Sequence, residues 1–172
     1  MKKKFIWWGF IALFLLPYSA WAEQSSYVLP YPSSMPGSSL YFAHQTLEKL
    51  SKFWYFGDFA QFKYNLKYSD KYLVEAKTLF EYRQYLLASD SLNKSNYYFE
   101  KLNGNLLRAK ENGKNISEKE KMLKLAAEKH KEVLLLIKNT TPPSFNWRPE
   151  KEESRLLNLH KLIDYSFNLR KL

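Results

Sequence analysis

Apolar residues recur every three or four positions through most of this chain, with charged and polar residues between them. This spacing places the apolar side chains along one face of an α-helix. It predicts three long helices, one starting at Asp58, one at Tyr85 and one at Ser117, with breaks near Tyr82 to Gln84 and at Asn112-Gly113. Asp58 with Gln61, and Ser117 with Glu120, have the spacing of a capping box at a helix start.

A shorter helix is predicted before these, from Ser38 or Ser39 towards Gly57. Its apolar positions fall on one face, which we expect to pack on the core: Leu40, Ala43, Leu47, Leu50 and Trp54. The run Phe53-Trp54-Tyr55-Phe56 follows directly. Such residues can form a ligand platform or a membrane-surface anchor, but they more often join a helix end to the core, and we interpret them in that way.

The segment after the third long helix contains three prolines between Asn139 and Pro149 and is predicted to be a loop. A final helix is expected from Glu150 to about Arg170, with Leu156, Leu159 and Ile163 on one face. Five glycines in the chain leave little room for tight β-hairpins. The predicted fold is therefore all-α, an antiparallel bundle of four to five helices preceded by an extended Pro-rich arm.

The first 22 residues have the order of a secretory signal peptide: three lysines, an apolar run, and small residues before Glu23. Cleavage there predicts an extracytoplasmic protein, secreted, periplasmic or at the cell surface. The alternative is an uncleaved N-terminal membrane anchor, because the uncharged stretch is just long enough to cross a bilayer. Residues 23–39 are rich in proline and serine, and we expect this arm to lie along the helices.

The composition favours a basic protein without disulfides. The leader holds three of the 27 basic residues, which leaves 24 against 17 acidic ones, a net charge of +7; cysteine is absent. Lysine greatly outnumbers arginine, and arginine is the better residue for phosphate recognition, so no nucleic-acid partner is predicted. The charge favours an envelope protein or an anionic cell-surface polymer as partner, and it is compatible with peripheral contact to lipid headgroups.

Three tyrosines form a ridge beside the apolar face of the helix that starts at Asp58. Together with lysines of the same helix they are the candidate binding residues: Tyr64, Tyr68, Tyr72, Lys63, Lys67 and Lys71. If exposed, the ridge would suit a partner helix or a glycan. If the arm covers it, its role is structural.

No catalytic or metal motif is found. The histidines are His44, His130 and His160, and two of them have a carboxylate four residues on, which is weak support for a metal site. We interpret them as solvated or boundary residues and predict no enzyme activity and no cofactor. The function expected is that of a non-enzymatic extracytoplasmic interaction module. The alternative is a hydrolase or metal-handling envelope protein with a site inside the bundle.

Leu29-Pro30-Tyr31-Pro32, then Met35-Pro36-Gly37 and Leu40-Tyr41, resemble the start of the DUF5667 family of bacterial and archaeal domains. The aromatic segment before Asp58 and Tyr72-Leu73-Val74-Glu75-Ala76-Lys77 continue the resemblance, which covers about 27–110. Ser33 stands where members usually have glycine. The resemblance implies an exported helical domain of undetermined role and no active site. The predicted organisation is a signal peptide (1–22), an arm (23–39), a DUF5667-like domain (40–112) and C-terminal helices (113–172, with a loop at 139–149).

Overall fold

The computed structural model describes residues 26–151 and 153–172 of the 172-residue chain. In this part it is mostly helical, as predicted. The elements are α1 (Ser39–Ser51), the 3-10 helix η2 (Lys52–Trp54), α2 (Asp58–Glu81), α3 (Tyr85–Glu111), α4 (Ser117–Thr140), β1 (Phe145–Trp147), β2 (Arg155–Leu157) and α5 (Leu159–Leu169). The predicted leader, residues 1–22, lies outside the described residues. No helix among the described residues is long and apolar enough to cross a membrane.

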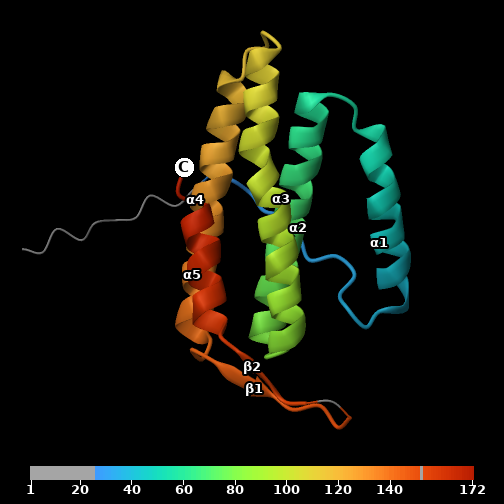
Figure 1. Cartoon of the computed structure of the whole chain (residues 1–172), viewed down its shortest axis with the longest axis vertical. Helices are drawn as coiled ribbons and strands as arrows, with labels where there is room; N and C mark the ends of the chain where they lie inside the picture. Colours follow the sequence, from blue (N-terminus) through green and yellow to red (C-terminus); the bar gives the residue numbers. More distant parts are fainter. Residues whose placement is uncertain (1–25, 152) are drawn as a thin grey trace, which may run out of the picture.

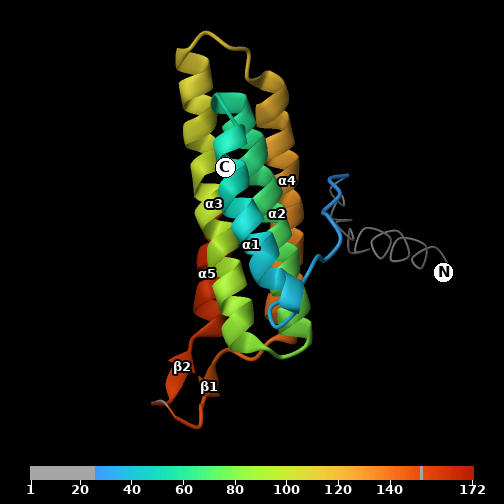
Figure 2. The same ribbon diagram turned by 90° about the vertical axis from the view of Figure 1, so that its right-hand side faces the viewer.

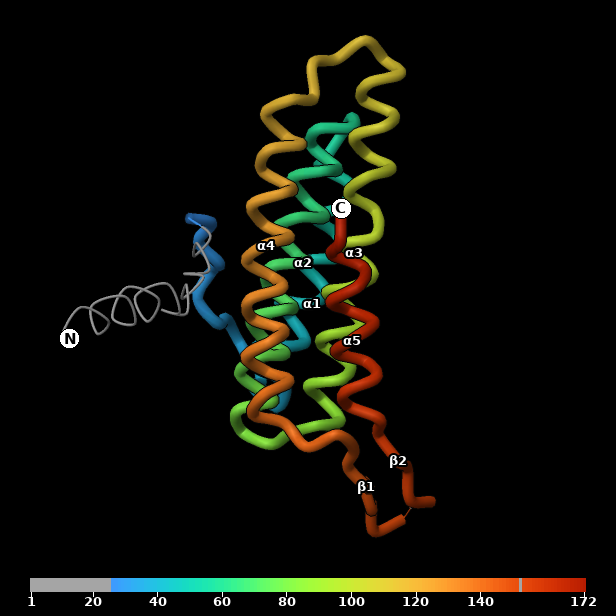
Figure 3. Tube along the Cα trace, turned by 90° about the vertical axis from the view of Figure 1, so that its left-hand side faces the viewer, coloured from blue at the N-terminus to red at the C-terminus, as the bar shows by residue number. Residues whose placement is uncertain are grey.

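The bundle is built on the antiparallel pair α2 and α3, which pack against each other along their length (Figure 1). Helix α4 packs against this pair, and α5 lies against α3 and α4 over one half of the bundle (Figure 3). Helix α1 stands beside the pair on the other side, as Figures 1 and 2 show. The three long helices therefore begin where the sequence predicted them.

The predicted capping boxes do not form. Gly57, with φ of 82°, precedes α2 without a side-chain cap, and the Gln61 amide donates instead to the Tyr55 carbonyl. At the start of α4 the Ser117 N–H donates to Asn115 Oδ1 at 3.0 Å, so the asparagine does the capping. At α2 a residue of the predicted box, Gln61, therefore bonds to a carbonyl before the helix, and at α4 a side chain outside the box, Asn115, accepts from the backbone.

The final helix was predicted too long, and the loop at 139–149 is partly structured. Helix α4 continues to Thr140, and β1 pairs antiparallel with β2 in the register Phe145↔Leu157. Phe145 packs on Tyr85 with ring centroids 4.9 Å apart, which ties the hairpin to the bundle. The backbone groups of residues 155–157 thus form hydrogen bonds with β1 instead of within a helix. Helix α5 therefore begins only at Leu159.

The core contains three clusters of buried side chains, and a polar layer lies between the two larger ones. One cluster joins the later part of α2, the earlier part of α3, the later part of α4 and α5, and contains Leu73, Leu92, Leu134 and Ile163. The other joins the opposite ends of α2, α3 and α4, and contains Phe62, Phe99, Leu102 and Leu123. The layer between them is buried but polar: Ser69, Asp70, Ser95, Asn96, His130, Ser166 and Arg170.

The arm touches the bundle at selected points. Leu29 and Met35 pack against the first cluster, and the Tyr27 hydroxyl donates to Asp70 Oδ2 at 2.6 Å. Val28 and Tyr31 point away and are highly exposed. Part of the predicted contact between arm and helices is therefore present.

Candidate functional site

The predicted tyrosine ridge is buried rather than exposed. Tyr64, Tyr68 and Tyr72 line one face of α2 and form a cluster with Tyr55 and Tyr98. Tyr64 and Tyr68 meet edge to face with centroids 4.6 Å apart, and Tyr72 stacks on Tyr98 at 5.9 Å. The idea of an open tyrosine surface is therefore wrong for this chain.

Helix α1, more than the arm, covers the tyrosines. Glu48 of α1 is buried against them: it accepts hydrogen bonds from Lys71 Nζ at 2.9 Å and from the Tyr98 hydroxyl at 3.3 Å. The Tyr64 hydroxyl donates to the Glu48 carbonyl at 3.2 Å. Burial raises the pKa of Tyr72 and of Tyr98, so both hydroxyls stay protonated. The ring hydroxyls require polar partners, and α1 supplies them.

The three candidate lysines separate into two kinds. Lys71 is held in the ion pair with Glu48, whereas Lys63 and Lys67 are exposed on α2. Lys67 Nζ lies over the Tyr68 ring, 5.5 Å from its centroid. Only Lys63 and Lys67 therefore keep the accessible charge that was predicted for all three.

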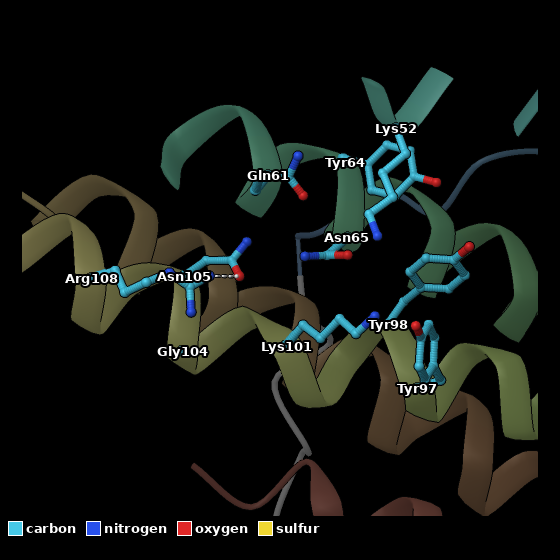
Figure 4. A pocket seen from close by; sticks show the side chains of 10 residues that line it. All are labelled: Lys52, Gln61, Tyr64, Asn65, Tyr97, Tyr98, Lys101, Gly104, Asn105 and Arg108. Carbon is cyan, nitrogen blue, oxygen red and sulfur yellow. Dashed lines mark hydrogen bonds between the residues drawn. The ribbon is translucent and has the colours of Figure 1, made fainter. Parts of the chain in front are cut away.

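A polar pocket opens between α2 and α3 beside η2, with a volume of about 360 Å³ (Figure 4). Three of its residues are cationic, three are amides and three are tyrosines. The lining consists of Lys52, Gln61, Tyr64, Asn65, Tyr97, Tyr98, Lys101, Gly104, Asn105 and Arg108. No carboxylate stands among these residues, so the pocket carries an excess of positive charge.

Each wall of the pocket comes from one regular helix face. On α3 the residues Tyr97, Lys101, Asn105 and Arg108 follow at intervals of four, four and three, which is the spacing of one helix face. In Figure 4 the ammonium group of Lys52 approaches Asn65 from η2, opposite α3. Sequence reasoning missed this stripe, although its polar periodicity could have revealed it.

The cations of the pocket differ in how far they are neutralised. Lys101 Nζ lies 3.4 Å from the centroid of the Tyr97 ring, and Lys101 lowers the pKa of the Tyr97 hydroxyl by its hydrogen bond and its charge. Arg108 Nε lies 3.7 Å from Asp58 Oδ1, so its charge is partly balanced outside the pocket. Lys52 and Lys101 make no ion pair within the described residues.

Asn105 is the most unusual group of the pocket. Its side chain is 2% exposed, and its Oδ1 accepts a hydrogen bond from Arg108 Nη2 at 3.0 Å. Its Nδ2 is buried and has no partner among the described residues. In Figure 4 this nitrogen points towards the space between Gln61 and Asn65. A buried donor without a partner is costly, and a ligand oxygen would satisfy it.

Residues 33–144 match the family model described as "Domain of unknown function (DUF5667)". That match covers more than half of the chain. The chain belongs to the DUF5667 family. No curated protein and no solved structure matches it. All ten pocket residues lie inside the DUF5667 match, which also includes α4, whereas the hairpin and α5 follow it.

The polar layer of this DUF5667 member joins four helices and the arm. Asp70 of α2 contacts His130 of α4 through Oδ1 and Nε2, 2.7 Å apart. His130 in turn accepts from Arg170, whose Nη1 donates to Asn96 Oδ1 at 2.8 Å and whose Nη2 donates to Ser95 Oγ at 2.9 Å. Burial lowers the pKa of Arg170 to about 9, so the guanidinium remains protonated at neutral pH and balances Asp70.

The histidines do not form the pairs that their spacing suggested. His130 is completely buried, so its interpretation as a solvated or boundary residue is wrong. His44 contacts Ser34 Oγ at 2.8 Å, and Glu48 turns inward to Lys71. His160 contacts the Thr141 carbonyl, while Asp164 accepts from Lys138. No group of three or more potential metal ligands occurs in the part of the chain that the structure describes.

Proposed function

We propose that this DUF5667 domain is a non-enzymatic binding module that receives an acidic unit of an envelope polymer in the pocket between α2 and α3. The observation that carries the proposal is the convergence of Lys52, Lys101 and Arg108 on a pocket lined without a carboxylate. A fixed excess of positive charge raises the local concentration of anions and speeds their association. The ligand is then a carboxylate or a phosphate of a larger chain.

The remaining lining favours a unit that also carries hydroxyl groups. Asn105 offers a free donor, and Gln61 and Asn65 add amides beside it. Tyr97 and Tyr98 provide flat faces of the kind that sugars and polyols contact, with polar hydroxyls at their edges. The combination of point charges, amides and ring faces suits an acidic sugar or a polyol phosphate better than a bare ion.

An open pocket of this size takes one or two units of a polymer and leaves the chain free to continue on both sides. Single sites of this kind bind weakly, and several domains along one polymer would gain strength by avidity. The predicted leader is consistent with such a setting, because it would place the domain outside the cytoplasm. The alternative of a hydrolase or metal-handling protein has no comparable cluster in its support among the described residues.

The test is binding of the chain from Glu23 to three immobilised polymers: polygalacturonate, polyphosphate and neutral dextran. We expect retention on one or both polyanions, weakened by salt, and none on dextran. Lys52→Gln/Lys101→Gln should reduce the affinity about tenfold or more. The matched control is Lys121→Gln/Lys161→Gln, which removes the same charge from exposed positions on α4 and α5.

Three results would overturn the proposal. The first is no retention on either polyanion. The second is an equal loss in the pocket variant and in the control, which would indicate a response to net charge alone. The third is release of shortened polymer products, which would favour the hydrolase alternative.

A further inference from the structure

Helix α1 is inverted relative to its own sequence pattern: the apolar face predicted to enter the core faces outward. Leu40 is 60% exposed, Leu47 57% and Leu50 49%. Ala43 of the same face is also exposed. Phe42 adds a further apolar side chain that is 78% exposed. The prediction that this face packs on the core is therefore wrong.

The inversion is explained by the polar face on the other side of the helix. Tyr41 donates to Glu75 Oε1 at 2.8 Å, and Glu48 pairs with Lys71 at 2.9 Å. A helix turns by about 100° per residue, so residues 41 and 48 share one side and Leu50 lies roughly opposite. These polar contacts hold α1 to α2 and leave its aliphatic side free.

The exposed apolar surface continues past the end of α1. Phe53, Trp54 and Phe56 are 71%, 72% and 83% exposed, so the interpretation of this aromatic run as a link to the core is wrong as well. We call the exposed residues from Leu40 to Phe56 the α1 face: Leu40, Phe42, Ala43, Leu47, Leu50, Phe53, Trp54 and Phe56. Large exposed apolar patches of soluble proteins mark interaction sites.

The charge around the α1 face identifies its partner. Glu48 is the one acidic residue between residues 39 and 57, and it is buried and paired. Lys49 and Lys52 on the same segment are exposed, as are Lys63 and Lys67 on the neighbouring helix. Two copies of this face would bring lysines against lysines, whereas an anionic surface would complement them.

A groove beside the face supports a lipid partner. It lies between the arm, α1 and α2, has a volume of about 440 Å³, and is lined in part by Tyr31, Leu47, Trp54 and Tyr68. Lys67 also lines it, so an apolar surface lies next to a solvent-accessible cation. An acyl chain beside an anionic headgroup is complementary to this arrangement, because the chain matches the apolar surface and the headgroup matches the cation.

We propose that the α1 face docks on an anionic lipid surface, with its leucines and aromatic rings at the acyl boundary and its lysines at the phosphates. Aromatic and aliphatic residues on one side with lysines at the edge are the pattern of helices that lie in a membrane interface. Trp is well suited to the level of the headgroups, and Phe and Leu are typical of the apolar face of such helices. The α1 face and its groove lie apart from the pocket between α2 and α3, and the one residue that the two proposals share is Lys52.

The test uses Trp54 as its own reporter. In the chain from Glu23 the tryptophans are Trp54 and Trp147, so Trp147→Phe leaves a single indole on the α1 face. We expect a blue shift of its emission, and sedimentation of the protein, with vesicles of phosphatidylcholine containing about one third phosphatidylglycerol. Vesicles of phosphatidylcholine alone should give at least about tenfold weaker binding, because they lack the anionic charge.

Two double variants distinguish docking through the α1 face from nonspecific hydrophobic adsorption. In the same background, Leu47→Ser/Leu50→Ser should weaken vesicle binding about tenfold or more, with an unchanged circular dichroism spectrum. The matched control is Leu107→Ser/Leu135→Ser, which removes two equally exposed leucines from α3 and α4 and should bind as the parent does. Equal binding by the Leu47→Ser/Leu50→Ser variant, or no binding to anionic vesicles, would overturn the proposal. A blue shift that depends on protein concentration without lipid would overturn it too, in favour of a second copy.

Discussion

Arg170 Nε donates a hydrogen bond to His130 Nδ1 across 2.9 Å, with both side chains fully buried. A guanidinium has no acceptor atom, so Nδ1 must be the unprotonated nitrogen of the ring. The proton therefore sits on Nε2 and is donated to Asp70 Oδ1. A neutral imidazole in one tautomer thus links a buried cation to a buried carboxylate.

The stability of the protein is expected to fall in mild acid because of His130. Burial lowers the pKa of His130 below its ordinary value, and the charge of Arg170 acts in the same direction. The unfolded histidine takes up a proton below about pH 6.5 and the folded one does not, so the full stability is present above that pH and is lost as the pH falls. We expect this residue to remove about 1 kcal/mol from the free energy of unfolding between about pH 7.5 and pH 5.5, measured by urea denaturation.

Two variants isolate this contribution. His130→Gln retains an acceptor and a donor but cannot titrate, and its unfolding free energy should depend less steeply on pH. His44→Gln removes an exposed histidine and should leave the slope as it was. An identical slope for His130→Gln and the parent would contradict the neutral state assigned to the buried ring.

Replacement of Arg170 by methionine should be strongly destabilising. The change leaves Asp70 buried without a compensating cation and removes the donors to Ser95 and Asn96. Breaking a buried pair by removing one partner costs about 3–5 kcal/mol. Urea denaturation measures the loss, and Arg148→Met at an exposed position is the control, with an expected change within about 0.5 kcal/mol. A small effect of Arg170→Met would mean that the layer tolerates the uncompensated acid.

Replacement of Asn105 by leucine should separate stability from binding. Leucine has nearly the same shape and removes the unpaired Nδ2, so the free energy of unfolding should stay level or rise by about 1 kcal/mol. Retention on the polyanion should fall in the same variant, because the free donor is gone. Asn103→Leu, at an exposed position of α3, should change neither quantity. A loss of stability with full binding would show that Asn105 serves the fold alone.

The inverted α1 predicts an unusual pair of results. Leu50→Gln should leave the free energy of unfolding within about 0.5 kcal/mol of the parent, because the side chain already faces solvent. Glu48→Leu should lower it by about 1–3 kcal/mol, because Lys71 and Tyr98 lose their acceptor. Thermal and urea unfolding distinguish this from the arrangement that the hydrophobic pattern predicts, in which the leucine change is the harmful one.

The long helices could be predicted because the apolar stripe of each helix packs against the apolar stripes of the others. Leu73, Leu92 and Leu134 lie on three regular stripes and are all buried in one cluster. The orientation of α1 could not be predicted in this way. The neighbouring helices present tyrosine hydroxyls and Lys71 to it, and the need of these groups for polar partners outweighs the aliphatic stripe.

The sequence pattern pointed to the lysines of α2, and the pocket lined by Lys52, Lys101 and Arg108 was not predicted. Basic residues were expected to carry the binding, yet Lys101 and Arg108 lie on α3 and form a pocket only when α2 and η2 lie opposite them. The hairpin escaped prediction because no turn signal such as Asn-Gly separates its strands. Arg170 could not be placed at the centre, since an arginine near the end of a helix is ordinarily solvated.

The position of Arg170 has a consequence for the order in which the chain folds. Asp70 precedes Arg170 by 100 residues, so α2, α3 and α4 leave the ribosome before the residue that neutralises their interior. Before α5 is synthesised, Asp70 has no buried cation to compensate its charge. Burying this carboxylate is then unfavourable, which disfavours the packing of α2, α3 and α4 against one another. We therefore expect the growing polypeptide to unfold easily through most of its synthesis and to become stable only when Arg170 has been added.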